Sequence, residues 1–482
     1  MFTNNYNYKY TDIQDNDIYN IIQKEVKINT KFTDDKKIGV MLIGIGGNNG
    51  STFFASILAH QKRLRWENKN GIHKVDFIGS LYQYGTANIG FKDNKPYTKL
   101  LREITCFKGP DDIVITGWDI NKDNIYDACK KNKIIDLDLL NQLKDDLKKI
   151  VPLESVYYEN FIATNQKERV NNVKKNKTKS DHLLYVKSDI QSFKIKHNLK
   201  KIVVVWTAST ERFSKGNWKT IDDLLLAISN NDPEISPSII FAVAAIIEGC
   251  IFINGSPQNT ICPVILQLAK KYNTFVSGED FKTGQTKLKS VLVDFLASSG
   301  IKPLSIVSYN HLGNNDGYNL SEQPQFESKE ITKRNVIDDI IEENKILFNN
   351  KKPEHCVVIK YIEAVGDSKR AMDEYYSELF LDGRSTISIH NTCEDTLLAV
   401  PVILDTILFS EYFSRITFTL EDGTNVPFSS NLSLLSFFFK APVDDDNPIT
   451  NAFFKQRYGL ENFIKASRGL PINDFINLHN RI

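Results

Sequence analysis

The chain has 482 residues, of which 41% are hydrophobic and 25% charged, with 60 Lys and Arg against 59 Asp and Glu. This composition is that of a globular protein with two or three folded units, and it excludes disordered, collagen-like and coiled-coil classes. The net charge of +1 argues against a dedicated nucleic-acid binder or a polybasic membrane protein.

Membrane, secretory and metal signals are weak in this sequence. The best apolar run, IIFAVAAII at 239–247, stops at Glu248, so we expect no run of the roughly 20 residues that a membrane span needs. The N-terminus lacks an apolar signal core. Six scattered cysteines without C-x-x-C spacing predict reduced thiols in a cytoplasmic protein, and isolated histidines predict no metal site.

The first elements in chain order open a βαβ unit. Residues 1–35 are polar, with Tyr and Asn interleaved, and predict an extended arm. The run KIGVMLI at 37–43 predicts a buried strand, and it is followed by the glycine-rich turn GIGGNNG at 44–50 and a helical pattern to about Lys62.

Further strands and helices alternate up to about residue 277. We predict strands at 75–79, 112–116, 201–206, 251–254 and 274–277, and helices at 221–229, 238–248 and 263–272. Such alternation indicates a doubly wound parallel sheet.

The pattern changes past about residue 300. Alternating polar and apolar residues predict strands at 302–309, 356–362, 372–381 and 386–390, in a mostly antiparallel sheet, and an apolar helix at 392–413. We therefore expect an α/β fold with an inserted α+β domain. The expected division is an arm at 1–35, a first dinucleotide-binding part at 36–286, the insert at 287–394 and a return at 395–482.

The glycine turn after the first strand is a candidate phosphate-binding turn. Its spacing, G-x-G-G-N-N-G, is one residue longer than G-x-G-x-x-G, but its strand–helix context favours a dinucleotide site. The alternative is a tight turn without a ligand. The predicted strand at 75–79 ends without a ribose-binding carboxylate, so Asp119 is the better candidate; its alternative role is to cap a helix that starts at Lys122.

Two further predicted strands end in small polar residues. WTAST at 206–210 and NGSPQN at 254–259 carry hydroxyl and amide groups that can bond a nicotinamide ribose or carboxamide, or can form ordinary turns and caps.

Lysines recur in polar loops that follow. They lie among amides and carboxylates in GEDFKTG at 278–284, SYNHLGNNDG at 308–317, SKEITK at 328–333, GDSK at 366–369 and NTCED at 391–395, and at Lys440. Generic surface lysines are the simpler explanation for each one alone. Their clustering suits chemistry in which ammonium groups bind phosphate, stabilise an oxyanion, or act as bases with lowered pKa.

Together, these segments resemble the eukaryotic-type myo-inositol-1-phosphate (inositol-3-phosphate) synthase family. GIGGNNGST, GWDIN, SPQNT, GQTKLKSVL, SYNHLGNNDGYNLS, SKEITK, DEYYSELFLDG and HNTCEDTLLA match its signatures in order, from about residue 36 to the C-terminus. The resemblance implies a modified Rossmann domain, an inserted catalytic and tetramer-forming domain, and bound NAD. It implies conversion of D-glucose 6-phosphate to 1D-myo-inositol 3-phosphate by C5 oxidation, enolisation, intramolecular aldol closure and re-reduction. The resemblance also implies that this isomerase reaction is the first step of inositol biosynthesis, which supplies phospholipid biosynthesis, and that it takes place in the cytoplasm.

The resemblance also implies roles for individual residues. Lys369 matches the lysine that takes the C5 hydroxyl proton, and Lys440 the lysine near the C1 oxygen. The other implied catalytic residues are Lys329, Lys333, Asp280, Asn310, Asn314 and Asp316. The implied cofactor residues are Gly44, Gly46, Gly47, Asn48, Asn49, Asp119, Ser155, Val156, Gln166, Arg169, Thr207, Ala208, Ser209, Thr210, Gly255, Ser256, Asp367 and Asp395, with Ser209 standing where many relatives have Asn.

Three functions are compatible with these features. The first is the synthase, a homotetramer with glucose 6-phosphate as its substrate and neither nucleic acid nor membrane as a partner. The second is a different NAD-dependent oxidoreductase, which would release NADH and would not need four lysines. The third is a non-enzymatic sensor of sugar phosphate or NAD, which would not need Lys369 and Lys440 together.

Overall fold

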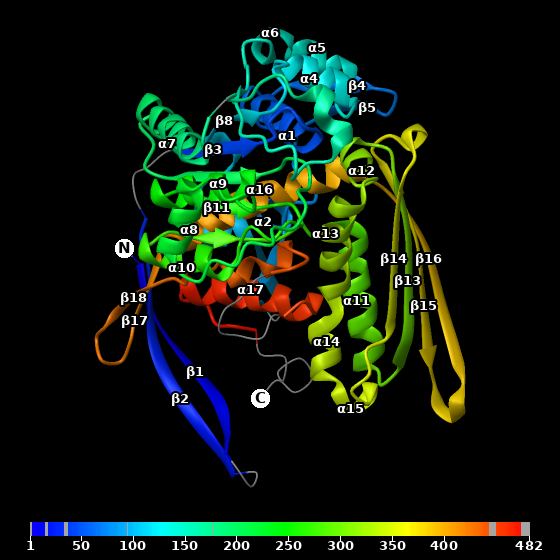
Figure 1. The fold of residues 1–482 in the computed structure, drawn as a ribbon. Helices are drawn as coiled ribbons and strands as arrows, with labels where there is room; N and C mark the ends of the chain where they lie inside the picture. Colours follow the sequence, from blue (N-terminus) through cyan, green and yellow to red (C-terminus); the bar gives the residue numbers. More distant parts are fainter. Residues whose placement is uncertain are drawn as a thin grey trace.

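A six-stranded parallel sheet forms the centre of the molecule (Figure 1). The computed structural model describes residues 2–14, 18–32, 37–93, 95–175, 177–442 and 450–473. The central strands are β3 (Ile38–Ile43), β8 (Ile113–Asp119), β9 (Leu153–Glu154), β10 (Ile202–Trp206), β11 (Ile251–Asn254) and β12 (Val276–Ser277). Their order in the sheet, β12-β11-β10-β3-β8-β9, is that of a Rossmann fold, so the predicted fold class is confirmed.

Helices cover both faces of this sheet because its strands are apolar on both sides. All six residues of β3 are buried. Ile38, Val40 and Leu42 join one hydrophobic core, with residues of α1 (Asn48–Gln61) and α16 (Asp395–Phe413). Met41 and Ile43 face the other core, with residues of α9 (Pro237–Ile247). Such runs without alternation are typical of parallel strands buried on both faces.

The prediction of a strand at 75–79 is wrong. This segment is irregular and contains Phe77 and Gly79 at positive φ, 54° and 100°. It follows a small hairpin of β4 (Arg65–Asn68) and β5 (Gly71–Lys74), whose residues are mostly exposed. The next strand of the central sheet is therefore β8, which pairs directly with β3.

A second, four-stranded sheet lies at one side of the molecule, with helices between it and the central sheet (Figure 1). Its strands, in the order β14-β13-β15-β16, are β13 (Lys302–Leu312), β14 (Glu354–Tyr361), β15 (Ser368–Glu378) and β16 (Arg384–Glu394). β13 pairs antiparallel with β15 and parallel with β14, so this sheet is mostly antiparallel, as predicted. The helices that accompany it include α11 (Gly284–Ser298), α12 (Asn315–Asn319) and α13 (Gln323–Arg334).

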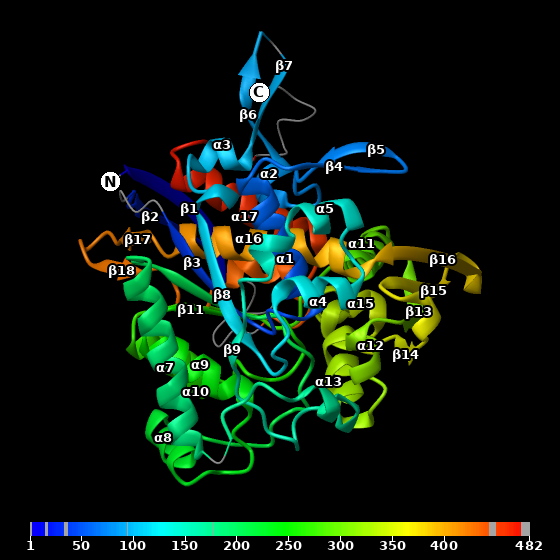
Figure 2. The same cartoon turned by 90° about the horizontal axis from the view of Figure 1, so that it is seen from above.

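The N-terminal residues expected to form an extended arm form a long β-hairpin instead. Its strands, β1 (Phe2–Gln14) and β2 (Ile18–Thr30), pair antiparallel and extend from the body on the side away from the second sheet (Figures 1 and 2). β2 also pairs with β17 (Ile416–Thr419), which pairs with β18 (Asn425–Pro427). The hairpin therefore shares a sheet with the strands that follow α16.

The helix α16 corrects one expectation from the sequence. By length and composition alone it is apolar enough to cross a membrane, although no such segment was expected. However, 89% of the most apolar 18 residues of α16 are buried inside the protein. They pack against the central sheet and the aromatic residues of the C-terminal segment. Its apolar character is thus satisfied by the core of the fold.

The remaining elements are connections and covering helices. The helices are α2 (Leu81–Tyr84), α3 (Leu101–Thr105), α4 (Ile125–Asn132), α5 (Leu137–Gln142), α6 (Lys144–Leu147), α7 (Lys179–Lys196), α8 (Ile221–Ser229), α10 (Pro263–Lys271), α14 (Asp338–Glu343), α15 (Lys345–Phe348) and α17 (Phe453–Ser467). The 3-10 turns are η1 (Pro110–Asp112), η2 (Thr164–Arg169), η3 (Asn335–Ile337), η4 (Glu363–Val365), η5 (Phe380–Asp382) and η6 (Ser433–Phe438), and a further hairpin joins β6 (Thr86–Lys92) to β7 (Lys95–Leu100).

Candidate active site

A large cavity opens where the strand order reverses, at the carboxyl ends of β3 and β10. The glycine turn forms one wall. Gly44 has a φ of +85°, and a Cβ there would lie 2.6 Å from the Cα of Ala208, so only glycine fits. The turn leads into α1 at Asn48, with Gly47 as the N-cap. Because the first N–H groups of a helix lack partners within it, this end of α1 suits a pyrophosphate.

Asp119 lies at the carboxyl end of β8, beside the glycine turn. Its Oδ2 accepts a hydrogen bond from the Gly46 N–H at 2.8 Å, and its Oδ1 accepts one from the Asn121 N–H at 2.9 Å. The helix that follows is capped by Asn124 instead, so the alternative role of Asp119 as a helix cap is wrong. The buried carboxylate is thus held at the position that suits a ribose hydroxyl.

The polar residues that follow β10 and β11 line the same cavity but also bond to each other. The Thr207 hydroxyl donates to the Ile43 carbonyl at 2.9 Å, and the Ser256 hydroxyl donates to the Ala208 carbonyl at 2.9 Å. The Thr207 bond joins the loop after β10 to the end of β3, and the Ser256 bond joins the loop after β11 to the loop after β10. Gly255 packs against Phe281, whose ring would lie 2.0 Å from a Cβ at that position.

Three lysines gather around two carboxylates at the far end of the cavity. Lys329 and Lys440 both donate from Nζ to Oδ1 of Asp280, at 2.9 and 3.0 Å. Lys369 donates to Oδ1 of Asp395 at 3.0 Å. Lys329 comes from α13, Lys369 from β15, Asp395 from α16, and Lys440 from the segment after η6. The tertiary fold therefore brings four distant parts of the chain to one place.

The pKa values of these groups separate because their charges interact at close range. Burial alone would raise the pKa of Asp280, but the ammonium groups of Lys329 and Lys440 hold it well below its usual range. Burial lowers the pKa of Lys440 to about 7, although Asp280 opposes this shift. Burial acts the same way on Lys369, but Asp395 outweighs it and raises the pKa of Lys369. Near neutral pH the cluster therefore contains a partly neutral amine beside stable ammonium groups.

Backbone pairing fixes the position of Asp280 relative to Lys440. The Lys440 N–H donates to the Asp280 carbonyl at 2.8 Å, and the Asp280 N–H donates to the Ser256 carbonyl at 3.1 Å. Next to Asp280, the buried Glu279 accepts a hydrogen bond from the Ile261 N–H at 2.6 Å, and burial raises the pKa of Glu279 to about 8. The segment at 279–281 thus ties the cofactor-side loops to the lysine cluster.

A second, smaller cavity lies against the N-terminal part of α11. It is lined by Gln285, Thr286, Lys289, Ser308, Asn310, Lys333 and Asp373. The Lys333 Nζ donates to Asn310 Oδ1 at 3.1 Å, and the Lys289 Nζ lies 2.8 Å from His355 Nε2. Burial and the charges of neighbouring lysines, first Lys369 and Lys440, lower the pKa of Lys333 well below its usual value.

Hydrogen bonds between amide and carboxylate groups connect Asp367, two residues before Lys369, to Asn48 at the start of α1. The Asn314 Nδ2 donates to Asp367 Oδ1 at 2.8 Å, and Asn314 also caps α12. Asp367 accepts from the Thr396 N–H at 2.8 Å and from Asn48 Nδ2 at 3.4 Å. Burial raises the pKa of Asp367.

Most of the site residues named from the sequence line the large cavity. These are Gly44, Gly47, Asn48, Asn49, Asp119, Ser155, Val156, Arg169, Thr207, Ala208, Ser209, Thr210, Gly255, Ser256, Asp280, Asn314, Asp316, Lys329, Lys369, Asp395 and Lys440. Gly46, Gln166 and Asp367 do not line it but bond to residues that do: Gly46 to Asp119, Gln166 to Arg169 at 2.9 Å, and Asp367 to Asn314. Lys333 and Asn310 line the second cavity.

Three buried or half-buried lysines were missed by sequence reasoning. Lys282, Lys287 and Lys289 follow Asp280 closely, and burial lowers their pKa values to about 7, 8 and 8. Lys287 is half-buried over the Phe437 ring and Lys289 is buried beside His355, so their surroundings come from segments that lie far away in the sequence. Among the described residues, no group of three or more His, Cys, Asp or Glu side chains could hold a metal ion, and the six cysteines are free.

The fold and the site are those of a dinucleotide-binding α/β protein. One cavity is lined by the glycine turn of its Rossmann sheet and by the lysines Lys329, Lys369 and Lys440. Residues 38–465 match the NAD-binding family described as myo-inositol-1-phosphate synthase. The chain belongs to this family. It is 48% identical to inositol-3-phosphate synthase 1-B of Xenopus laevis, over 96% of this chain and 84% of that protein.

Other relatives agree with this assignment. Inositol-3-phosphate synthase of Saccharomyces cerevisiae is 46% identical over 93% of this chain and 88% of its own length. The crystal structure of inositol-3-phosphate synthase from Caenorhabditis elegans aligns with a TM-score of 0.96 and 43% identity, over 100% of this chain and 96% of that chain. A myo-inositol-1-phosphate synthase-related protein from Thermotoga maritima, at 17% identity and a TM-score of 0.62 over 91% of this chain and 100% of that one, shares the fold.

Proposed function

We propose that the protein converts D-glucose 6-phosphate to 1D-myo-inositol 3-phosphate with NAD. The observation that carries this proposal is the pair of lysine amines, Lys329 and Lys440, on one carboxylate oxygen of Asp280, in the cavity that begins at the glycine turn. A hydride-transfer site beside preorganised cations suits a reaction that passes through an enolate. The family relationship to inositol-3-phosphate synthases supports the same substrate and product.

The cavity has the features that NAD requires. We propose that the turn at Gly44, Gly46 and Gly47 and the start of α1 hold its pyrophosphate, and that Asp119 holds a ribose. The positive φ of Gly44 and its close approach to Ala208 support this cradle, because a side chain there would block it. When bound, NAD supplies reversible uptake and return of a hydride. The residues at 207–210 and 255–256 would enclose its nicotinamide end.

We propose that the lysines divide proton transfer and charge stabilisation between them. The lowered pKa of Lys440 supports a role as proton acceptor and donor, whereas Lys329 and Lys369 stay charged beside Asp280 and Asp395. Fixed ammonium groups would stabilise the oxyanion formed when a proton leaves C6 and during closure onto C1. This division differs from the roles implied by resemblance, in which Lys369 takes the C5 hydroxyl proton.

The phosphate of the substrate would lie at the start of α11, where neighbouring residues line the two cavities. Thr283 lines the large cavity, and Gln285 and Thr286 line the small one. Buried Lys289 and Lys333 face the small cavity, so a helix N-terminus and two amines would surround the anion.

We further propose the domain division expected from the sequence, with an insert at 287–394 that forms a homotetramer. The contiguity of the second sheet, 302–394, supports it. On the free face of this sheet, Tyr309 and Met372 are paired across β13 and β15, and they are 47% and 49% exposed. Exposed apolar pairs of this kind suit a subunit interface. Six free cysteines support a cytoplasmic location.

The test is to incubate the purified protein with NAD and glucose 6-phosphate and to measure periodate-releasable phosphate. Product with no net NADH supports the synthase. Net NADH would favour another oxidoreductase, and binding without turnover would favour a sensor. Light scattering on the same sample tests the tetramer.

A further inference from the structure

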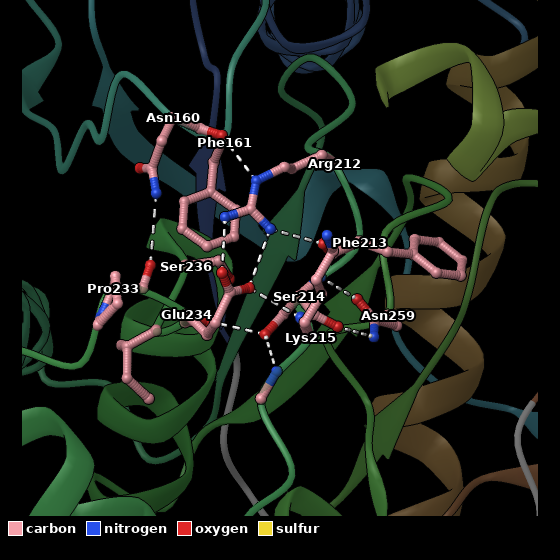
Figure 3. A network of polar contacts seen from close by, with 12 residues as sticks. Asn160, Phe161, Arg212, Phe213, Ser214, Lys215, Pro233, Glu234, Ser236 and Asn259 are labelled. Atoms are coloured by element: carbon pink, nitrogen blue, oxygen red, sulfur yellow. Dashed lines mark hydrogen bonds and ion pairs between the residues drawn. The ribbon is translucent and has the colours of Figure 1, made fainter. Parts of the chain in front are cut away.

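The Arg212 side chain joins the loops that carry Asn160, Phe213 and Glu234 (Figure 3). Its guanidinium makes a two-pronged ion pair with Glu234, at 2.9 and 3.0 Å, and its Nε donates to the Asn160 carbonyl at 2.8 Å. The guanidinium also lies 4.1 Å from the centre of the Phe161 ring. A planar cation that stacks and bonds in this way fixes all of its neighbours at once.

Phe161 connects this arginine to the helix that carries Lys329. The Phe161 carbonyl accepts one hydrogen bond from the backbone N–H of Arg212, at 3.0 Å, and another from the side-chain Nε2 of Gln325, also at 3.0 Å. Gln325 is buried on α13, four residues before Lys329, so the two lie one turn apart on the helix. The Phe161 side chain is fully buried, which leaves little room for the carbonyl to move independently.

Neighbouring contacts hold the adjacent part of the same helical segment. Asn165 Nδ2 donates to the Tyr318 carbonyl at 2.7 Å, and the Asn165 N–H donates to Glu322 Oε1 at 3.1 Å. Asn319 Nδ2 donates to the Thr210 carbonyl at 3.0 Å. The loops at 160–165 and 210–212 therefore support α12 and the start of α13 from the side of the central sheet.

We infer that Arg212 is a positioning residue that, through Phe161 and Gln325, sets the place of Lys329 at Asp280. The ion pair with Glu234 holds the guanidinium of Arg212 in place, because Glu234 is itself held by a hydrogen bond from the Lys215 N–H at 2.8 Å. Arg212 lies outside the two cavities, so it acts through the backbone and α13. The inference rests on the proposed function only for its measurement of turnover.

The experiment compares Arg212→Met, Arg212→Lys and the control Lys167→Met in the full chain. Lys167→Met breaks an ion pair with Glu159 in the same loop region, but both of those side chains are exposed, by 65% and 58%. For each variant, kcat, the KM for glucose 6-phosphate and amide hydrogen exchange of residues 318–334 are measured. Exchange of the core helix α16 serves as an internal reference.

We expect Arg212→Met to lower kcat by about tenfold or more, since small displacements of catalytic groups cost this much. Exchange at 318–334 should rise while α16 stays protected, and Arg212→Lys should recover only part of kcat because an ammonium cannot make the two-pronged pair. An unchanged kcat with unchanged exchange at 318–334, or equal loss of protection in α16, would overturn the inference. If the wild-type protein itself does not turn over glucose 6-phosphate, the proposed function fails, but the exchange measurements still decide this inference.

Discussion

Asp119 accepts a hydrogen bond from the backbone N–H of Gly46, although the two residues lie 73 positions apart in the chain. The contact exists because β8, which ends at Asp119, pairs directly with β3, which leads into the glycine turn. The carboxylate that we propose as the ribose ligand therefore also holds the turn that we propose as the pyrophosphate site. Loss of either group should disturb the other half of the cofactor site.

Gly44→Ala should abolish NAD binding. The added Cβ would lie 2.6 Å from the Ala208 backbone, at a φ of +85° that disfavours a side chain. NAD retained after purification, measured by absorbance and mass after denaturation, is the readout. Gly71→Ala is the matched control, since Gly71 also has positive φ, +118°, but nothing lies within 4 Å of its Cβ position. Equal loss of NAD in both variants would show that backbone strain alone is responsible.

Lys369→Ala should reduce turnover by at least about 10²-fold while NAD still binds, because an ammonium beside the reacting carbons is lost. Periodate-releasable phosphate and NAD fluorescence quenching measure the two effects separately. Lys352→Ala removes an exposed lysine paired with Asp338 and should leave both unchanged. A near-normal rate in Lys369→Ala would remove this residue from the reaction.

Asp280→Asn should destabilise the protein, by about 3–5 kcal/mol, because two buried ammonium groups lose their common partner. The free energy of unfolding in urea measures the loss. Adding Lys440→Met to this variant should recover part of it by removing one of the uncompensated amines. Asp111→Asn, which breaks an exposed pair with Arg63, should cost at most about 1 kcal/mol. The same small cost for Asp280→Asn would mean that the cluster is not charged as described.

The rate should rise with pH through a limb near pH 7. Below the pKa of Lys440, about 7, its amine is protonated and cannot accept a proton, whereas above it the amine is neutral. A profile of kcat/KM against pH from 5.5 to 9 measures this limb. In the residual activity of Asp280→Asn the limb should move to lower pH, because the charge of Asp280 raises the pKa of Lys440. A shift in the opposite direction would contradict Lys440 as the base.

Lys289→Met should raise the KM for glucose 6-phosphate at least about tenfold with little change in NAD retention. The buried amine faces the small cavity at the start of α11, where we place the phosphate. Inhibition by inorganic phosphate should weaken in parallel. A variant that binds phosphate as the wild type does would exclude this cavity as the phosphate site.

The parallel sheet could be predicted from sequence because short β-branched runs such as those of β3 and β10 are buried on both faces. The strand predicted at 75–79 failed because a short apolar run does not by itself distinguish a strand from an irregular segment, and only Phe77 of this run is buried. Asp119 was still chosen correctly as the residue at a strand end. The N-terminal hairpin was missed because its strands carry many polar residues, and the pairing of β2 with β17 depends on a segment almost 400 positions away.

The sequence alone determined the residue types of the site, since the glycine turn and the lysine-bearing segments are local patterns. The expectation that these lysines lie in polar loops was wrong for Lys329 and Lys333, which lie on α13, and for Lys369, which lies on β15. Only the tertiary structure decided how those lysines pair: α13, β15, α16 and the segment after η6 meet at one point, where Asp280 takes two amines and Asp395 one. It also decided that Lys440 has a lowered pKa and Lys369 a raised one, because charge interactions and desolvation depend on distances that no linear spacing encodes.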